Sequence, residues 1–304
     1  MGIVIGLVGC GRWGINHLQV MTRLQNEGLV QRVVVCDVDG ERLTNIQADA
    51  TYANLESMLS AEALAGVAIA TPPETHLRLA KMVLDKNLPL LLEKPLSNNH
   101  AASKTFLAEV PNNSILVVGY LLRHHEGLLQ TQTAAFAKDV GSIQDVVYTR
   151  RTQRTRPEGA TPISTLAVHA ADTLAWLLAQ PLMHGEAVHA VHSENAASWR
   201  IRFPTGQTGA FDVAWASSDE RRLVEVKGTR GRAQIDFGSH EMTVIDSSGI
   251  VVRTERLADS EPLLAEWLHF LNRIKAGSPC VFPDIEHLLD QSEWLRLNDP
   301  ENER

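Results

Sequence analysis

The chain contains little cysteine, few aromatic residues and no long apolar segment. Its 304 residues include 3 cysteines, and aromatic residues make up 5% of the composition. Three scattered cysteines are too few for a disulfide framework, which favours a reducing cytoplasm as the location of the protein. No apolar run approaches the roughly 18–20 residues of a membrane-spanning helix, so we expect no membrane association.

Positive charge is also in short supply. The chain has 28 Lys and Arg residues against 36 Asp and Glu residues, a formal net charge of −8. Nucleic acids require a basic surface, so we expect no nucleic-acid partner. His189 and His192 are three residues apart in a predicted strand and therefore point to opposite faces, which makes them a poor metal pair. We expect no metal site.

The first 120 residues alternate buried strands with helices. Apolar runs at residues 3–8, 33–36, 67–70, 90–92 and 115–118 have the pattern of parallel strands, and residues 12–25 and 75–85 have helical spacing. This alternation with short turns predicts an α/β Rossmann domain, a doubly wound parallel sheet, over residues 1–121.

The pattern changes after residue 122. A predicted helix near 125–138, a strand at 143–149 and an apolar helix at 168–178 precede a series of strands and turns between 185 and 254. Helices at about 261–276 and 284–297 close the chain. These elements predict an α+β domain over residues 122–304 with a large open, mainly antiparallel sheet, whose C-terminal helices can pack back on the first domain. No flexible linker separates the two, so a ligand cleft is expected between them.

A glycine pattern directly after the first predicted strand indicates a dinucleotide site. Gly9, Gly11 and Gly14 fit G-x-G-x-x-G. Gly9 permits the tight turn, Gly11 lets the pyrophosphate approach the backbone, and Gly14 lets helix and strand pack closely. The following helix begins at Arg12 and Trp13 and offers its N–H groups to phosphates. The alternative is that these glycines only shape a turn in a flavodoxin-like domain.

An acidic residue ends the second predicted strand. The Asp37 carboxylate can accept hydrogen bonds from both ribose hydroxyls of NAD. It would repel a 2′-phosphate by about 4 kcal/mol per charge pair at about 4 Å and an effective dielectric of about 20. Asp39 adds a second negative charge, and no arginine follows until Arg42. NAD is therefore favoured over NADP.

Two further motifs follow later strands, at the edge of a parallel sheet where ligands bind. One is Ala70-Thr71-Pro72-Pro73-Glu74-Thr75-His76, and the other is Glu93-Lys94-Pro95. By itself, Glu-Lys-Pro could equally be a salt-bridged turn. The complete set of expected cofactor-binding residues is Gly9, Gly11, Arg12, Trp13, Gly14, Asp37, Thr71, Pro72, Pro73, His76, Glu93 and Lys94.

In combination, these stretches resemble the glucose–fructose oxidoreductase, inositol dehydrogenase and MocA family of oxidoreductases. The specific stretches are "GCGRWGINH", "VVVCDVD", "ATPPETH" and "EKPL", and the looser ones are "VGYLLRHH", "VHAADTLAWLL" and "VEVKGTRGRAQIDF". The resemblance implies hydride exchange between a nicotinamide and a sugar, polyol or related hydroxyl compound. It also implies a second-domain sheet that is often buried in oligomer contacts, so we expect a homo-oligomer through this sheet.

The resemblance implies that Lys94 and His169 are catalytic. A fixed ammonium stabilises the negative charge that develops on oxygen as a hydride leaves an alcohol, and a histidine can take or return the hydroxyl proton. Many family members carry Asp where this chain has Thr165. Either proton transfer depends on Lys94, or Asp172 compensates, or the protein has become a non-catalytic NAD-binding sensor or regulatory protein.

A cluster of arginines bears on the substrate. "GYLLRHH", which contains Arg123, looks like a stretch found in sugar-nucleotide members of the family. Arginines then crowd the stretch "TRRTQRTRPE", and guanidinium groups bind a diphosphate well. The alternative, slightly favoured, is a solvated edge strand protected by charge. The expected substrate residues are Arg123, Arg156, Thr165 and Asp172.

Overall fold

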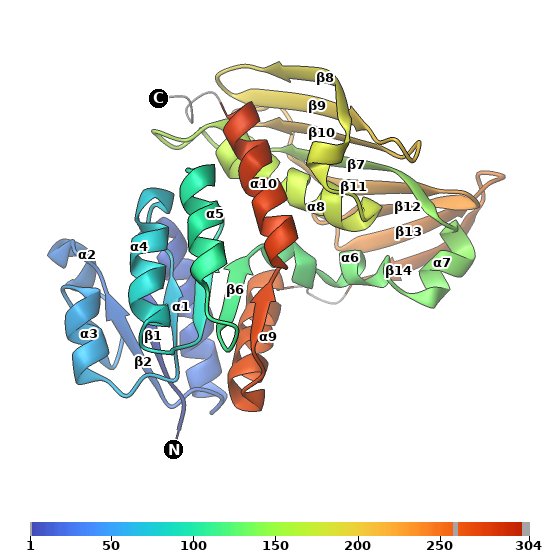
Figure 1. Cartoon of the computed structure of the whole chain (residues 1–304). Helices are drawn as coiled ribbons and strands as arrows, with labels where there is room; N and C mark the ends of the chain where they lie inside the picture. The colour runs from blue at the N-terminus through green and yellow to red at the C-terminus, as the bar shows by residue number, and fades with distance from the viewer. Residues whose placement is uncertain (1, 258–260, 300–304) are drawn as a thin grey trace. The chain divides into compact units, whose positions relative to one another are not determined.

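A computed structural model of the chain describes residues 2–257 and 261–299 (Figure 1). These residues form two compact units. Residues up to 120 together with 263–292 make up the first unit, and residues 121–262 together with those from 293 onward make up the second. Within the described ranges, none of the helices has the length and apolar character of a membrane span.

The first unit is built on a seven-stranded sheet in the order β15-β6-β5-β4-β1-β2-β3, with every neighbouring pair parallel. Its strands are β1 (Val4–Val8), β2 (Arg32–Cys36), β3 (Ala50–Tyr52), β4 (Gly66–Ile69), β5 (Leu90–Glu93), β6 (Ile115–Gly119) and β15 (Cys280–Phe282). Its helices are α1 (Arg12–Asn26), α2 (Gly40–Leu43), α3 (Leu55–Ala61), α4 (Pro73–Leu84), α5 (His100–Glu109), most of α9 (Pro262–Ala276) and the first half of α10 (Ile285–Asn298).

Burial explains why these segments form strands and helices. The central strands β4, β5 and β6 are buried at every residue, as expected of a parallel sheet covered on both faces. On α1, Leu18, Met21 and Leu24 recur at helical spacing and are buried in the same core cluster as Leu7 of β1. The predicted doubly wound parallel sheet is confirmed. The sequence patterns did not mark β3 or β15, which have three residues each.

The second unit is built on an eight-stranded sheet in the order β14-β13-β12-β11-β7-β10-β9-β8. Its strands are β7 (Ile143–Arg151), β8 (Glu186–His192), β9 (Ala196–Arg202), β10 (Thr208–Ala214), β11 (Arg221–Gly228), β12 (Gly231–Asp236), β13 (Glu241–Asp246) and β14 (Val251–Arg256). All neighbouring pairs are antiparallel except β7 with β10, which is parallel. The predicted large, mainly antiparallel sheet is confirmed.

The structure corrects the interpretation of the arginine-rich stretch as an edge strand. Strand β7 lies inside the sheet, paired with β10 on one side and β11 on the other. Its Val146 and Tyr148 are buried, and α8 (Val168–Leu178) packs against it. An apolar face of this kind needs cover from a helix, which an exposed edge position does not require.

The helices of the second unit are shorter than expected near its start. The single helix predicted at 125–138 is two helices, α6 (Glu126–Gln130) and α7 (Ala134–Val140). A 3-10 turn at Leu121–His124 precedes α6. The break comes at Thr133, whose side chain caps α7 by accepting a hydrogen bond from the N–H of Phe136. A π-helical turn, Ile163–Ala167, runs directly into α8.

Candidate cofactor and active site

In the glycine turn between β1 and α1, the backbone is crowded at Gly9 and Gly14 and open at Gly11. Gly9 has φ of +96°, and a Cβ at Gly14 would lie 1.9 Å from the carbonyl oxygen of Gly9. A Cβ at Gly11 would meet only Nη1 of Arg42, at 3.5 Å. Gly11 is the N-cap of α1 and provides no side-chain cap, so the first N–H groups of the helix are available to an anion.

Asp37 is held in a fixed orientation at the end of β2. Its Oδ2 accepts a hydrogen bond from the N–H of Cys10 at 2.7 Å, and its Oδ1 accepts one from the N–H of Asp39 at 2.9 Å. Arg42 lies beside it, with Nη1 at 3.7 Å from Oδ2 of Asp37 and Nε at 3.2 Å from Oδ2 of Asp39. The buried carboxylate thus adjoins the glycine turn, which is the arrangement that an adenosine ribose requires.

His76 joins the two proline-containing loops. It is fully buried, and its Nδ1 and Nε2 each lie 2.9 Å from a carbonyl oxygen, that of Pro95 and that of Thr71 respectively. Burial lowers the pKa of His76, and the two carbonyl oxygens oppose this shift. Pro72 and Pro73 begin α4. The imidazole therefore holds the loop at residue 71 against the Glu-Lys-Pro loop from inside the unit.

Glu93 and Lys94 form a strongly connected pair at the end of β5. Oε1 of Glu93 accepts hydrogen bonds from Nε1 of Trp13 and, at 2.9 Å, from Nε2 of His17, and Oε2 accepts one from the N–H of Lys94 at 3.1 Å. Burial alone would raise the pKa of Glu93, but the hydrogen bond from His17, the charge of Lys94 and the hydrogen bond from Trp13 bring it below its ordinary value.

Lys94 has a perturbed ammonium group. Burial lowers its pKa, the negative charge of Glu93 opposes this shift, and the positive charge of Arg12 adds to it. A lysine with a lowered pKa next to a fixed carboxylate is typical of functional sites. Sequence patterns pointed to Glu93 and Lys94 but not to His17, which lies about one turn along α1 from Trp13.

In the second unit, Thr165 and His169 lie on either side of the end of the π-helical turn. The hydroxyl of Thr165 donates to the carbonyl oxygen of Thr161 and accepts from Nε1 of Trp215 at 3.1 Å. His169 is half-buried in the first turn of α8. π-helical turns are rare and are frequent at functional sites. Thr165 is thus part of a hydrogen-bonded chain in which it provides no negative charge.

Arg123 and Asp172, two expected substrate residues, are paired with each other. Nε of Arg123 lies 2.9 Å from Oδ1 of Asp172, and their side chains are 9% and 1% exposed. The guanidinium also lies over the ring of Trp176, 5.4 Å from its centroid. The charge of Asp172 is therefore balanced by Arg123, which ties the segment before α6 to α8.

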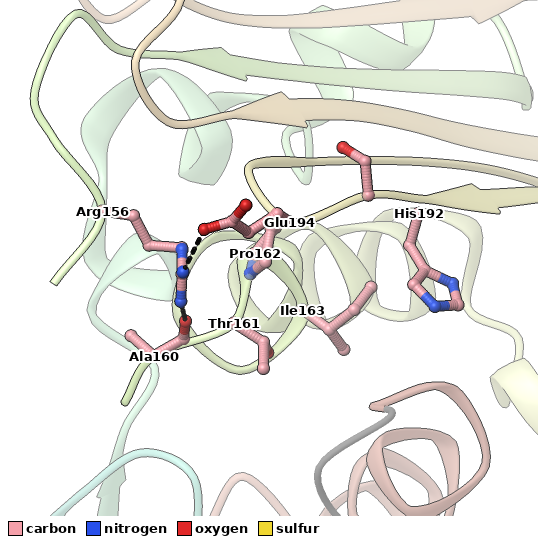
Figure 2. Close-up of a pocket in the computed structure, with 8 residues that line it drawn as sticks. Arg156, Ala160, Thr161, Pro162, Ile163, His192 and Glu194 are labelled. Atoms are coloured by element: carbon pink, nitrogen blue, oxygen red, sulfur yellow. Dashed lines mark hydrogen bonds and ion pairs between the residues drawn. The ribbon is translucent and has the colours of Figure 1, made fainter. Parts of the chain in front are cut away.

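Arg156 lines a hollow of about 220 Å³ in the second unit (Figure 2). Its Nη2 lies 2.9 Å from Oε1 of Glu194, and its Nη1 donates to the carbonyl oxygen of Ala160. Arg150 and Arg151 are also ion-paired, with Glu220 and Asp212. The acidic partners come from distant segments of the chain and neutralise most of the arginine cluster.

Fold and site together define the first unit as a dinucleotide-binding Rossmann fold. Residues 3–120 match the family described as "Oxidoreductase family, NAD-binding Rossmann fold". This match lies in the first unit, which contains the motifs that predicted a resemblance to the glucose–fructose oxidoreductase, inositol dehydrogenase and MocA family.

Named relatives share moderate sequence similarity with the chain. Inositol 2-dehydrogenase 1 of Saccharopolyspora erythraea is 29% identical over 67% of this chain and 62% of its own length. D-apiose dehydrogenase of Paraburkholderia graminis is 26% identical over 75% of this chain and 66% of its own length. The chain thus spans about three-fifths of the length of the inositol dehydrogenase relatives, 62% and 60% for two of them.

Solved structures match nearly the whole chain in fold. Levoglucosan dehydrogenase, in complex with NADH and levoglucosan, superimposes with a TM-score of 0.83 at 17% identity, covering 99% of this chain and 98% of that one. UDP-N-acetylglucosamine 3-dehydrogenase from Acidithiobacillus ferrooxidans superimposes with a TM-score of 0.79 at 18% identity, covering 98% of both chains. At this level of identity, the likeness establishes the fold.

Proposed function

We propose that the protein is an NAD-dependent oxidoreductase. It would transfer a hydride between the nicotinamide and the hydroxyl or keto carbon of a sugar, polyol or sugar nucleotide. The observation that carries this proposal is the Glu93–Lys94 pair, a fully hydrogen-bonded carboxylate beside a lysine of lowered pKa, at the ligand-binding edge of a dinucleotide fold. The dehydrogenase names of the relatives support it.

The residues of the first unit fit NAD. The first turn of α1 and the backbone at Gly11 would hold the pyrophosphate, and Asp37 would accept the hydroxyls of the adenosine ribose. When bound, NAD supplies a nicotinamide ring that accepts or returns a hydride. Asp37 and Asp39 disfavour a 2′-phosphate, whereas Arg42 partly offsets their charge. The balance of charge favours NAD over NADP.

Lys94 and His169 would act on the substrate oxygen. The ammonium of Lys94 would stabilise the negative charge that develops on this oxygen during alcohol oxidation. The imidazole of His169 would take the hydroxyl proton and return it during the reverse reaction. Thr165 contributes a hydroxyl bound to Trp215 in place of a carboxylate, so the positive charge of Lys94 carries more of the stabilisation.

We further propose a homo-oligomer through the sheet of the second unit. Strand β8 is exposed along its whole length, and β14 exposes Val251 and Val252. Exposed apolar side chains on long strands are features that proteins cover by pairing or packing. Sedimentation of the full chain would test this proposal, with a monomer at micromolar concentration as the contradicting result.

Substitution of Lys94 by Met tests the proposed function. With a panel of myo-inositol, aldoses and UDP-sugars, the wild-type protein should reduce NAD, and Lys94→Met should lower turnover by about 10²–10³-fold or more. Calorimetry should show that the variant still binds NAD. Lys81→Met, on the exposed side of α4, is the control and should behave as wild type. Unchanged turnover in Lys94→Met would remove Lys94 from the mechanism, and a wild-type protein that binds no nicotinamide coenzyme would overturn the proposal.

A further inference from the structure

The Glu93 carboxylate is the end of a buried chain of hydrogen bonds that begins near the C-terminus. Nε1 of Trp267, in α9, donates to Nδ1 of His17 at 3.1 Å, across 250 positions of sequence. Nε2 of His17 lies 2.9 Å from Oε1 of Glu93. Trp267 and His17 are 0% and 1% exposed. All three residues belong to the first unit.

Donor and acceptor are fixed at each hydrogen bond from Trp267 through His17 to Glu93. An indole N–H can only donate, so Nδ1 of His17 must be the acceptor in the contact with Trp267. The ring proton therefore resides on Nε2, which donates to the Glu93 carboxylate. Trp267 thus selects the tautomer of His17 that can hold Glu93. With the other tautomer, a nitrogen lone pair would face the carboxylate.

The Glu93 carboxylate, which accepts this hydrogen bond, is held at both of its oxygens. Trp13 also donates to Oε1, and the N–H of Lys94 donates to Oε2. A Cβ at Gly119, on the neighbouring strand β6, would lie 3.1 Å from Oε1, so the glycine leaves just enough space for the carboxylate. A buried carboxylate is tolerated when donors of this kind satisfy it.

A second buried carboxyl, that of Glu266, shows how these hydrogen bonds affect the pKa of Glu93. Glu266 precedes Trp267 in α9 and is 0% exposed, and neither of its carboxyl oxygens has a hydrogen-bond partner among the described residues. Burial, and secondarily the charge of Glu93, raises its pKa well above the ordinary value. The pKa of Glu266 is thus raised, whereas that of Glu93 is lowered. The donors supplied by His17, Trp13 and Lys94 account for this difference.

We propose that Trp267 and His17 are positioning residues for Lys94, because their hydrogen-bond chain keeps the Glu93 carboxylate charged and oriented beside the lysine. This inference rests on the proposed function, in which Lys94 acts on the substrate oxygen. The charged groups that act on the Lys94 ammonium are Glu93, from its own strand, and Arg12, from α1. Loss of the Glu93 charge would leave the lysine facing only Arg12.

The first test measures the His17 tautomer directly. In the full-length protein labelled with ¹⁵N-histidine and saturated with NAD, the ¹⁵N shifts of His17 should indicate a proton on Nε2 and none on Nδ1. Trp267→Phe removes the indole N–H, so the shifts should then indicate a mixture or a changed protonation state. Trp294→Phe is the matched control, because Trp294 is equally buried and its indole nitrogen has no hydrogen-bond partner among the described residues.

The second test measures the pH at which the Lys94 side chain loses its proton, and it needs no substrate. Acetylation of Lys94 by acetic anhydride, followed by mass spectrometry across a range of pH, reports the fraction of free amine. The half-point should move to lower pH in Trp267→Phe and further in His17→Leu, because each variant weakens the charge of Glu93. His17→Gln, which can still donate to Glu93, should recover most of the wild-type profile. Trp294→Phe should leave the profile unchanged.

The third test measures turnover, and its result depends on the proposed function of Lys94. His17→Leu should lower kcat by about 10–100-fold, the range expected for a lost hydrogen bond to a charged group, with little change in KM. The inference would be overturned if wild-type His17 carries its proton on Nδ1, or if the acetylation profile is unchanged in Trp267→Phe. If His17→Leu does not fold, the result for Trp267→Phe is the deciding one. Unchanged turnover in Lys94→Met would instead overturn the proposed function, whatever the acetylation profile shows.

Discussion

The two units position their candidate site residues in different ways. In the first unit, the turn at Gly9–Gly14 and the carboxylate of Asp37 follow adjacent strands, and backbone N–H groups orient the carboxylate. In the second, pairs of side chains from distant segments fix the residues: Arg123 with Asp172 is separated by 49 positions and Trp215 with Thr165 by 50. The candidate cofactor residues are therefore positioned by interactions local in the sequence, whereas the candidate residues of the second unit depend on tertiary pairing.

The largest effect should come from breaking the buried pair of the second unit. Arg123→Leu removes the guanidinium that pairs with the 1% exposed Asp172, which should cost about 3–5 kcal/mol of unfolding free energy. This corresponds to a fall in Tm of about 10 °C for a protein of this size, measurable by calorimetry. Such a loss would show that Arg123, a predicted substrate residue, is essential to the stability of the second unit.

Two further variants show whether the buried pair itself is responsible. Arg123→Leu combined with Asp172→Leu should recover much of the lost stability, since no charge then remains buried. Lys81→Leu breaks a pair whose side chains are both 61% exposed and should change Tm by no more than about 1–2 °C. A small effect of Arg123→Leu, comparable to that of Lys81→Leu, would contradict the role assigned to the pair.

A smaller and more selective effect should come from Asp37→Ser in the first unit. Removing this carboxylate removes one of the two negative charges beside Arg42, whose Nε stays paired with Asp39, so the ratio of NADP to NAD affinity should rise by about 100-fold. Isothermal titration with both coenzymes measures this ratio. Asp39→Asn removes the second negative charge, while its amide oxygen can still cap α2 through the N–H of Glu41, so it should raise the ratio by less than Asp37→Ser does. An equal shift of the ratio in Asp39→Asn would contradict the special role of Asp37.

Much of the first unit was predictable because its signals are local. The strands at residues 4–8 and 90–93 are apolar on both faces, and the glycine spacing is needed by the turn itself, as the clash of a Cβ at Gly14 shows. The central position of β7 was not predictable, since register with β10 and β11 is decided by residues more than 60 positions away. The same holds for the acidic partners of the arginines.

The hydrogen-bond chain to Glu93 lay beyond sequence reasoning for a related reason. His17 on α1 and Trp267 on α9 each look like ordinary members of amphipathic helices. Only the fold reveals that the chain returns to the first unit after residue 262 and brings the indole to the imidazole. The motif "GRWGINH" contains His17, but nothing in the motif specifies which partner its nitrogens meet.

The smallest expected effect is a change of Tm with pH that depends on Glu266, and its sign is well defined. Its pKa is raised in the folded protein, so the unfolded chain releases this proton at lower pH than the folded one, and stability falls as pH rises from about 4.5 to the folded pKa. Glu266→Gln removes this dependence. Its Tm relative to wild type should therefore rise between pH 4 and pH 8, by about 2–4 °C for each kcal/mol.

Glu62 provides a control of opposite sign in the same unit. The hydroxyl of Tyr52 donates to its Oε1 at 2.7 Å and Arg32 pairs with it, which lowers its pKa despite some burial. Its stabilising effect is present at neutral pH and is lost as pH falls through the folded pKa. Glu62→Gln should therefore lose more Tm at pH 8 than at pH 4, whereas Glu266→Gln gains. Any constant cost of the amide cancels in each difference. Equal signs for the two variants would therefore contradict a raised pKa of Glu266, and with it the view that hydrogen bonds decide which buried carboxyl has a lowered pKa.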